Sequence, residues 1–241
     1  PITSLEPVAG LTKLRFIEVS DNDLADLSPL AGLDDLVRVG AARLPNVTDI
    51  SSLAGKSIAS LWLNGSSNIA DFSPIQGLTN LNTLLVGDTG FDDTDMQMLT
   101  SLPSVARLQV WGNPAVTDLS PVSNLPLYEI DIGGTSVTDL TPLHGMAESM
   151  QNLSAYWLGL DGADIEFLAD FTNLSSLNLA GNALVNLETL VTNPGLGDDD
   201  TLLIDHNCLD LSPGSEASQQ LETLLARGVE VTYEPQRTCE P

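Results

Sequence analysis

The stretch TDLSPVSNLPLYEIDIGGTSVTDLTPL, from Thr117 to Leu143, almost repeats its own opening at its end. It begins with TDLSPV and closes with TDLTPL, so that Leu119 and Leu140 lie 21 positions apart. Strong or weak copies of the same phrase occur at 4–8, 26–30, 49–53 and 71–75. Internal similarity with a period of ~20–50 residues is typical of solenoids and propellers. The sequence therefore predicts a repeat architecture.

A second pattern, LxxLxLxxNxI, lies between these phrases and fits 14–24 and 174–184. The second and third leucine positions of this pattern form an aliphatic pair that recurs nine times. Such a pair, two residues apart, is expected when one side of a short strand is buried. The earlier residue of each pair is Ile17, Val39, Leu61, Leu84, Leu108, Ile130, Leu158, Leu177 or Leu202. The later residue is Val19, Ala41, Leu63, Val86, Val110, Ile132, Leu160, Leu179 or Ile204. On this alignment the steps are 22, 22, 23, 24, 22, 28, 19 and 25 residues, which predicts an insertion around His144 to Asn152.

A single repeat cannot bury its apolar pair, so neighbouring repeats must stack. Three residues after each pair the chain turns, and an amide side chain there can bond backbone groups of the adjacent coil. This ladder position holds Asn22, Asn113, Asn182 and Asn207, with Ser66, Thr89 and Thr135 as substitutes and Leu44 as an exception. The proline-bearing phrase that follows favours a tight irregular or 3₁₀ turn. The longer return legs at 93–102 and 143–152 have room for short helices.

These repeats resemble the 22-residue leucine-rich repeats of bacterial internalins, whose units read NxIxDLSPLxxLxxLxxLxL. The resemblance covers the chain from about Ile2 to Leu211. It implies an α/β solenoid, a curved horseshoe with a parallel sheet on its concave side and an irregular or 3₁₀ convex side. We expect a single domain over 1–241, with repeats at 1–211 that begin in mid-repeat and a C-terminal helix–strand cap at 212–241.

Both cysteines, Cys208 and Cys239, lie near the C-terminus and flank a helical pattern at 215–227 and an alternating segment at 229–233. We expect a disulfide between them, worth ~3–4 kcal/mol on the chain-entropy model; two free, partly buried thiols are the alternative. A disulfide indicates an oxidising compartment, so the expected location is secreted, periplasmic or cell surface. Because residues 1–5 match the middle of a repeat, we expect a mature or trimmed fragment of a longer precursor.

The formal net charge is −25, and Lys13 and Lys56 are the only lysines. Nucleic-acid binding requires a basic stripe, which the sequence lacks. The sequence contains no run of ~18 apolar residues, the length that would predict insertion into a membrane. The charge indicates a solvated surface, with attraction of a cationic partner or Ca²⁺ as the alternative. The acidic runs at 92–95 and 198–200 lack calcium-loop spacing, and we interpret both as solvated turns.

Catalytic and metal-binding patterns are not found. His144 falls on the expected convex side and His206 at a strand exit without a serine in reach, so both are interpreted as surface histidines. Two histidines and two paired cysteines do not supply a zinc cluster, and no glycine-rich phosphate loop joins a strand to a helix. We therefore expect no enzyme activity, no cofactor and no metal.

The residues that flank the aliphatic pairs are expected to project from the concave sheet, and they include every tryptophan of the chain. Trp62, Trp111 and Trp157 fall on the third, fifth and seventh expected strands. Tryptophan and tyrosine are frequent energetic anchors at interfaces, although aromatic side chains also suit strands without any ligand. The expected ligand-binding set is Phe16, Trp62, Arg107, Trp111, Tyr128, Asp131, Tyr156, Trp157 and Asp161.

Three functions remain compatible with this surface. A module that binds a protein or peptide is favoured, because an open, shallow face buries little of a small ligand. An oligosaccharide-binding module is the alternative, since Trp rings stack on sugars and Asp, Asn and Gln bond hydroxyl groups. A structural spacer within a larger surface protein is the third possibility. The sequence leaves the oligomeric state open.

Overall fold

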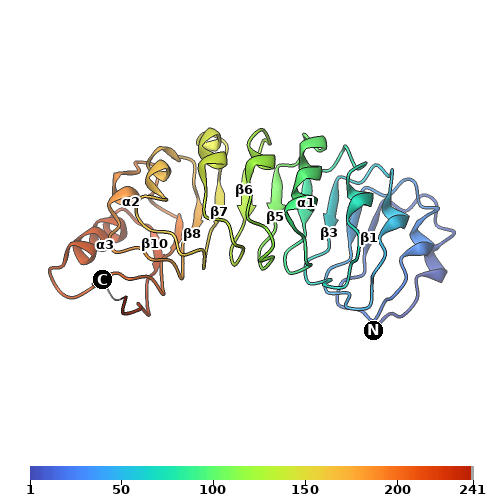
Figure 1. Ribbon diagram of the computed structural model, residues 1–241, viewed down its shortest axis with the longest axis horizontal. Helices are drawn as coiled ribbons and strands as arrows, with labels where there is room; N and C mark the ends of the chain where they lie inside the picture. The colour runs from blue at the N-terminus through green and yellow to red at the C-terminus, as the bar shows by residue number, and fades with distance from the viewer. Residues whose placement is uncertain (240–241) are drawn as a thin grey trace. The chain divides into compact units, whose positions relative to one another are not determined.

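The computed structural model describes residues 1–239. The chain divides into two compact units, Pro1–Pro126 and a second that begins at Leu127. In the first unit every strand has three residues with a buried middle residue, and each strand pairs in parallel with its sequence neighbour (Figure 1). These strands are β1 (Phe16–Glu18), β2 (Arg38–Gly40), β3 (Ser60–Trp62), β4 (Thr83–Leu85) and β5 (Arg107–Gln109).

The second unit repeats this arrangement. Its strands also pair in parallel and in sequence order, with Leu153 opposite Leu177 and Leu177 opposite Leu202. They are β6 (Glu129–Asp131), β7 (Asn152–Ser154), β8 (Ser176–Asn178), β9 (Thr201–Leu203) and β10 (Glu230–Thr232). Each unit is thus the stack of parallel-strand coils that the repeats predict. That the two units form one domain over 1–241 stays a prediction.

The return legs consist mainly of 3₁₀ turns, as the proline-bearing phrase predicts. In the first unit these are η1 (Glu6–Val8), η2 (Ser28–Leu30), η3 (Ser51–Leu53), η4 (Ser73–Ile75), η5 (Gln97–Ser101) and η6 (Ser120–Val122). In the second they are η7 (Thr141–Met146) and η8 (Glu166–Asp170). The expected short helix at 93–102 is confirmed as α1 (Asp93–Met96) followed by η5, whereas 143–152 contains only the end of η7. The helix α2 (Glu188–Thr192) was not predicted.

An aspartate begins most of these turns. Asp26 accepts hydrogen bonds from the Ser28 amide at 2.7 Å and the Ser28 hydroxyl at 2.8 Å, and Asp49 and Asp71 do the same with their serines. The serine amide and hydroxyl lower the pKa of Asp49 and Asp71, because both donate to the charged carboxylate. Part of the net charge of −25 is therefore explained by turn formation.

Buried asparagines link neighbouring coils, as the ladder position predicts. The side chain of Asn113 is fully buried; its Nδ2 donates to the Val86 and Val110 carbonyls at 2.8 and 2.9 Å. Its Oδ1 accepts from the Thr89 and Gly90 amides at 3.1 and 2.9 Å. Asn182 and Asn207 make equivalent bonds in the second unit. Leu44 occupies the ladder position without a polar side chain, and its backbone N–H donates to Ser66 Oγ of the next coil at 3.0 Å.

The seventh strand lies five residues before its predicted place. Leu153 and Ala155 are the buried pair, and the prediction of Leu158 and Leu160 is wrong. Both segments alternate apolar residues, but the backbone turns at Trp157, so Leu158 occupies the ladder position. Leu160 is buried in the return leg that follows. The strand centres 130, 153 and 177 are then 23 and 24 residues apart, so the expected insertion around His144 to Asn152 does not exist.

The C-terminal cap agrees with its prediction. The helix α3 (Glu216–Ala226) is N-capped by Ser215, whose hydroxyl accepts from the Ser218 amide at 3.2 Å. It lies beside α2 and β10 in the second unit (Figure 1). The chain leaves α3 at Gly228 with φ of 89°, a conformation that favours glycine. The disulfide between Cys208 and Cys239 is confirmed, with the two Cα atoms 5.5 Å apart.

The ladder predicts a large stability loss for Asn113→Ala. The substitution leaves two carbonyls and two amides without their buried partner, and we expect the free energy of unfolding in urea to fall by ~2–4 kcal/mol. Asn124→Ala is the matched control, because Asn124 is exposed and its amide contacts only the Ser123 hydroxyl, at 3.4 Å. A loss of equal size in both variants would contradict a structural role for the ladder.

Candidate functional site

The first unit carries a row of aromatic and arginine side chains on its strand side, the face from which the outer residues of each strand project. Phe16 in β1 is 57% exposed, although it is a large apolar side chain. The guanidinium carbons of Arg15 and Arg38 lie 5.6 and 5.7 Å from the centre of its ring. Arg38 also lies 5.7 Å from the ring of Trp62, at the end of β3. We call Arg15, Phe16, Arg38 and Trp62 the aromatic–arginine row.

A hollow of about 470 Å³ adjoins Trp62. Its polar groups are already held by protein partners: Arg43 Nε and Nη2 donate to the Asp21 carboxylate, each at 2.5 Å. These hydrogen bonds lower the pKa of Asp21 and keep it charged. The Asn64 side chain accepts from the Gly87 amide at 2.5 Å. The lining residues are Glu18, Ser20, Asp21, Ala42, Arg43, Trp62, Asn64 and Leu85.

Trp111 follows β5 and is half-buried over the neighbouring coil. A Cβ atom at Gly87 would lie only 2.3 Å from its ring, so this tryptophan requires glycine beneath it. Arg107 is the first residue of β5 and is half-buried as well. The structure therefore places four residues of the expected set on the strand side of the first unit: Phe16, Trp62, Arg107 and Trp111.

In the second unit Tyr156 and Asp131 form a partly buried cluster. The ring of Tyr156 covers Gly133, where a Cβ atom would lie 2.1 Å away. Burial raises the pKa of Asp131 to about 6, although its carboxylate accepts from the Gly133 amide at 3.0 Å. Burial, and then the charge of Asp131, raise the pKa of Tyr156 to about 12. Tyr128 is half-buried immediately before β6.

Trp157 occupies a conformation that large side chains avoid. Its φ is 56°, in the left-handed region, and its side chain is 51% exposed. The residue before the ladder position is left-handed in every other repeat too, but there it is Asp21, Arg43, Gly65, Asp88, Gly112, Gly134, Gly181 or His206. The indole covers Gly181 and lies 5.7 Å from the His206 ring and 5.5 Å from the Arg237 guanidinium. The left-handed conformation therefore belongs to the turn that ends each strand.

The placement of Asp161 on the concave face is wrong. Its carboxylate accepts from the amides of Ala163 and Asp164 at 2.8 and 3.3 Å, in the turn that opens the return leg. It thus matches Asp92, which caps α1 in the same manner. The error follows from the misplaced seventh strand. Tyr156 and Trp157 keep their place on the strand side, but they follow β7 rather than precede a strand.

Sequence reasoning missed the contacts of Arg38 and Arg237. The signal for Arg38 was available, because it lies 22 residues after Phe16 and is paired with it across β1 and β2. Arg237 is brought to Trp157 only by the path of the chain after β10, which repeat periodicity does not predict. His206 was interpreted as a surface histidine, and its Nδ1 lies 2.6 Å from Asp205 Oδ2.

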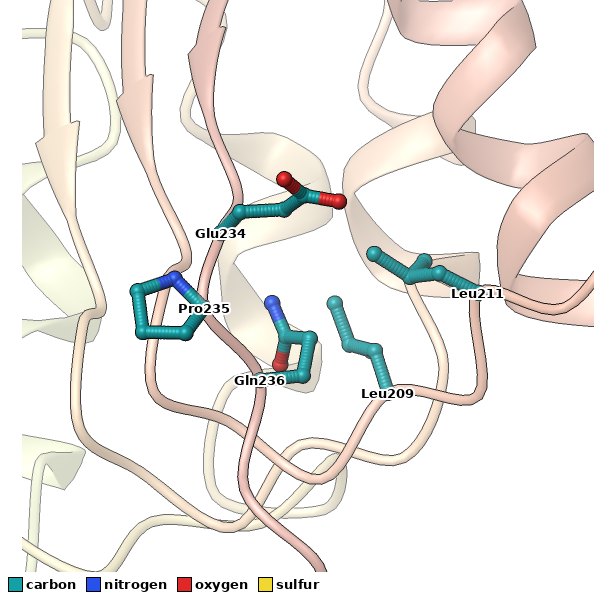
Figure 2. Close-up of a pocket in the computed structure, with 5 residues that line it drawn as sticks. All are labelled: Leu209, Leu211, Glu234, Pro235 and Gln236. Atoms are coloured by element: carbon teal, nitrogen blue, oxygen red, sulfur yellow. The ribbon is translucent and has the colours of Figure 1, made fainter.

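A separate cavity of about 580 Å³ lies in the cap, lined by Leu209, Leu211, Glu234, Pro235 and Gln236. Figure 2 shows the Leu209 and Gln236 side chains next to each other, with the Glu234 carboxyl group directed toward Leu211. The Gln236 amide nitrogen donates to the Ile204 carbonyl at 3.0 Å and to that of Tyr233, which ties the segment after β10 to the strands. None of the sequence-predicted binding residues lines this cavity.

Residues 1–239, which the structure describes, contain no group of three or more His, Cys, Asp or Glu side chains arranged to hold a metal ion. Over the same range, no helix combines the length and apolar character that crossing a bilayer requires.

No protein-family model and no curated protein matches this chain. Among solved structures it is similar to an internalin from Listeria monocytogenes, with 26% identity, a TM-score of 0.74, and coverage of 99% of this chain and 73% of that one. A leucine-rich-repeat protein from Leptospira interrogans is similar at 19% identity and TM-score 0.65, over 96% and 57% of the two chains. A plant peptide hormone receptor, solved in complex with RGF2, is similar at 17% identity and TM-score 0.59, over 97% and 46%.

The stacked strands, the buried asparagines and these neighbours define the chain as a leucine-rich-repeat protein. Its repeats are internalin-like.

The raised pKa of Asp131 predicts that Asp131→Asn stabilises the protein at neutral pH. Because the folded-state pKa of about 6 exceeds the usual value of ~3.9, ionisation disfavours the folded state, and stability falls as pH rises from ~4 to ~6. We expect the variant to melt at a higher temperature than the wild type at pH 7.5 and at the same temperature near pH 4. Carboxyl ¹³C NMR should place the Asp131 titration midpoint near 6.

Asp49→Asn is the control, because its expected change in melting temperature at pH 7.5 has the opposite sign. Its pKa is lowered by the Ser51 hydrogen bonds, so its charge favours folding above ~pH 4 and that contribution is lost below it. This variant should melt at a lower temperature than the wild type at pH 7.5. A lower melting temperature for Asp131→Asn at pH 7.5 would refute the account of the Asp131–Tyr156 cluster.

Proposed function

We propose that the chain is a non-catalytic binding module that recognises a protein or peptide through the strand side of its repeats. The observation that carries this proposal is the exposure of Phe16 on the strand side of the first unit, at 57%, and of Trp157 on the strand side of the second, at 51%. Exposed aromatic side chains supply large contact areas at little entropic cost and often anchor interfaces. The expected set of ligand-binding residues, without Asp161, belongs to this proposal.

The neighbouring structures support the same class of function. The plant peptide hormone receptor was solved in complex with RGF2, and a second plant receptor ectodomain in complex with CASPARIAN STRIP INTEGRITY FACTOR 2. We infer an extracellular or cell-surface location for this chain from the disulfide and from these neighbours.

An oligosaccharide is the second candidate ligand. The hollow beside Trp62 favours it, because an indole wall with Asn64, Ser20 and Glu18 around it offers both a stacking surface and hydrogen-bonding groups. Peptide binding is preferred, since the Trp62 indole N–H already donates to the Ser60 hydroxyl at 2.9 Å and the Asn64 amide is engaged by Gly87 and Gln109.

The test is a selection from displayed random peptides in parallel with a glycan array, followed by affinity measurements on single variants. Trp62→Ala, Trp111→Ala and Trp157→Ala should each weaken binding of the selected ligand, by ~2 kcal/mol or more where the ring is an anchor. Each should cost less stability than the ~3–5 kcal/mol expected for a fully buried aromatic side chain. The wild type and variants are melted in parallel to check this.

Leu225→Ala is the matched control, because Leu225 is an exposed apolar residue of α3 and belongs to no strand. It should leave binding unchanged. Normal binding by all three tryptophan variants, with loss of binding in Leu225→Ala, would refute the strand side as the site. Selection of glycans and no peptides would favour the oligosaccharide instead.

A further inference from the structure

Arg15 and Arg38 differ from Lys13, Lys56 and Arg43 in the first unit. The chain has 33 acidic and 8 basic residues, so an exposed cation has many available partners. Lys13, Lys56 and Arg43 each form an ion pair, with Asp35, Asp34 and Asp21 respectively. Within residues 1–239, the guanidinium groups of Arg15 and Arg38 pair with no carboxylate and contact aromatic rings instead. Their hydrogen-bonding capacity is therefore available to a ligand.

The rings hold Arg38 in a defined place. Its guanidinium carbon lies 5.7 Å from both the Phe16 and Trp62 ring centres, so one side chain is shared by two aromatic residues, one on each of the coils that flank its own. A guanidinium that rests against rings keeps N–H groups at its edge, and these match the two oxygens of a carboxylate. Less side-chain entropy is lost on binding when the arginine is already positioned.

The nearby acids do not neutralise this row. Glu18 has one oxygen occupied by the Ser20 amide, at 3.0 Å, and its carboxyl group lies above Gly40. Asp21 is bound by Arg43 through two hydrogen bonds. Three arginines and two acids thus share this part of the strand side, which makes it locally positive in a chain whose net charge is −25. Charge complementarity favours an anionic ligand at this part of the strand side.

We infer that the aromatic–arginine row binds an acidic peptide segment, in which an Asp or Glu carboxylate pairs with Arg38 and an adjacent apolar side chain packs on Phe16. This inference rests on the proposed function and specifies the ligand for the first unit. A peptide fits better than an acidic sugar, because the ring of Phe16 offers an apolar contact and the Trp62 N–H is occupied by Ser60. Arg15 supplies a second cation beside the same ring.

The test uses the full ¹⁵N-labelled chain and two short peptides, acetyl-GEFEG-amide and its neutral twin acetyl-GQFQG-amide. Heteronuclear NMR titrations follow the Arg38 Nε–H and Trp62 Nε1–H signals. The acidic peptide should shift both signals saturably, and the neutral twin should bind at least tenfold more weakly. Affinity for the acidic peptide should also fall between 50 and 300 mM NaCl, since its charge contributes to binding.

Two variants isolate the role of Arg38. Arg38→Met keeps an aliphatic stem between the rings and removes the charge, and it should weaken binding of the acidic peptide at least tenfold. Lys13→Met removes one positive charge outside the row and should change affinity less than twofold. An unchanged fingerprint spectrum elsewhere shows that each variant is folded.

Several results would overturn the inference. Equal affinity for the two peptides shows that the carboxylate is not recognised, and undiminished binding by Arg38→Met shows that Arg38 is not its partner. A glucuronate-containing tetrasaccharide that saturates the same signals at lower concentration than the peptide assigns the row to an acidic glycan. Peptide-induced shifts confined to Tyr156 and Trp157 also reject this inference but leave the proposed strand-side function intact. If the acidic peptide shifts no NMR signal in the first unit or in the second, the result counts against both this inference and the proposed strand-side function.

Discussion

Each coil of this protein must turn away from its sheet inside the core, where no water can bond the backbone. The buried asparagine resolves this constraint, because one amide side chain can satisfy carbonyls and N–H groups of its own coil and the coil before it. Asn113 makes four such bonds in the first unit, and Asn182 and Asn207 do so in the second. The side chain thereby fixes the point at which a strand ends.

That point determines which residues face the core and which face a partner. Side chains alternate along a strand, so a shift of one residue would exchange the two faces. With the ladder in place, Ile17 and Leu61 are buried while Phe16 and Trp62 project outward. The opposite side of each coil is used for turn formation, where aspartates such as Asp49 and Asp71 bond the serines that open the 3₁₀ turns. The turn-forming aspartates and the outward-facing aromatic residues of the strands therefore lie on different sides of the repeats.

The sequence predicted the repeats well wherever several apolar positions agreed. It failed at the seventh strand because Leu153-Ser-Ala155 is a weaker apolar alternation than Leu158-Gly-Leu160, and only the turn at Trp157 distinguishes them. The aromatic candidates could be identified because their positions recur within the repeat. Asp161 was misplaced through the same register error. The contact of Arg38 with two rings depends on side-chain directions across three strands, and that of Arg237 with Trp157 depends on the non-repetitive cap.

The strand register leaves Phe16 and Trp157 open to solvent, whereas Phe91 and Phe171 in the return legs are core. Hydroxyl-radical footprinting of the isolated protein, quantified for each residue by mass spectrometry, tests this directly. We expect rapid oxidation of Phe16 and Trp157, which are 57% and 51% exposed, and strong protection of Phe91 and Phe171, which are each 1% exposed. Protection of Phe16 and Trp157 equal to that of Phe91 and Phe171 would contradict the register and the binding surface derived from it.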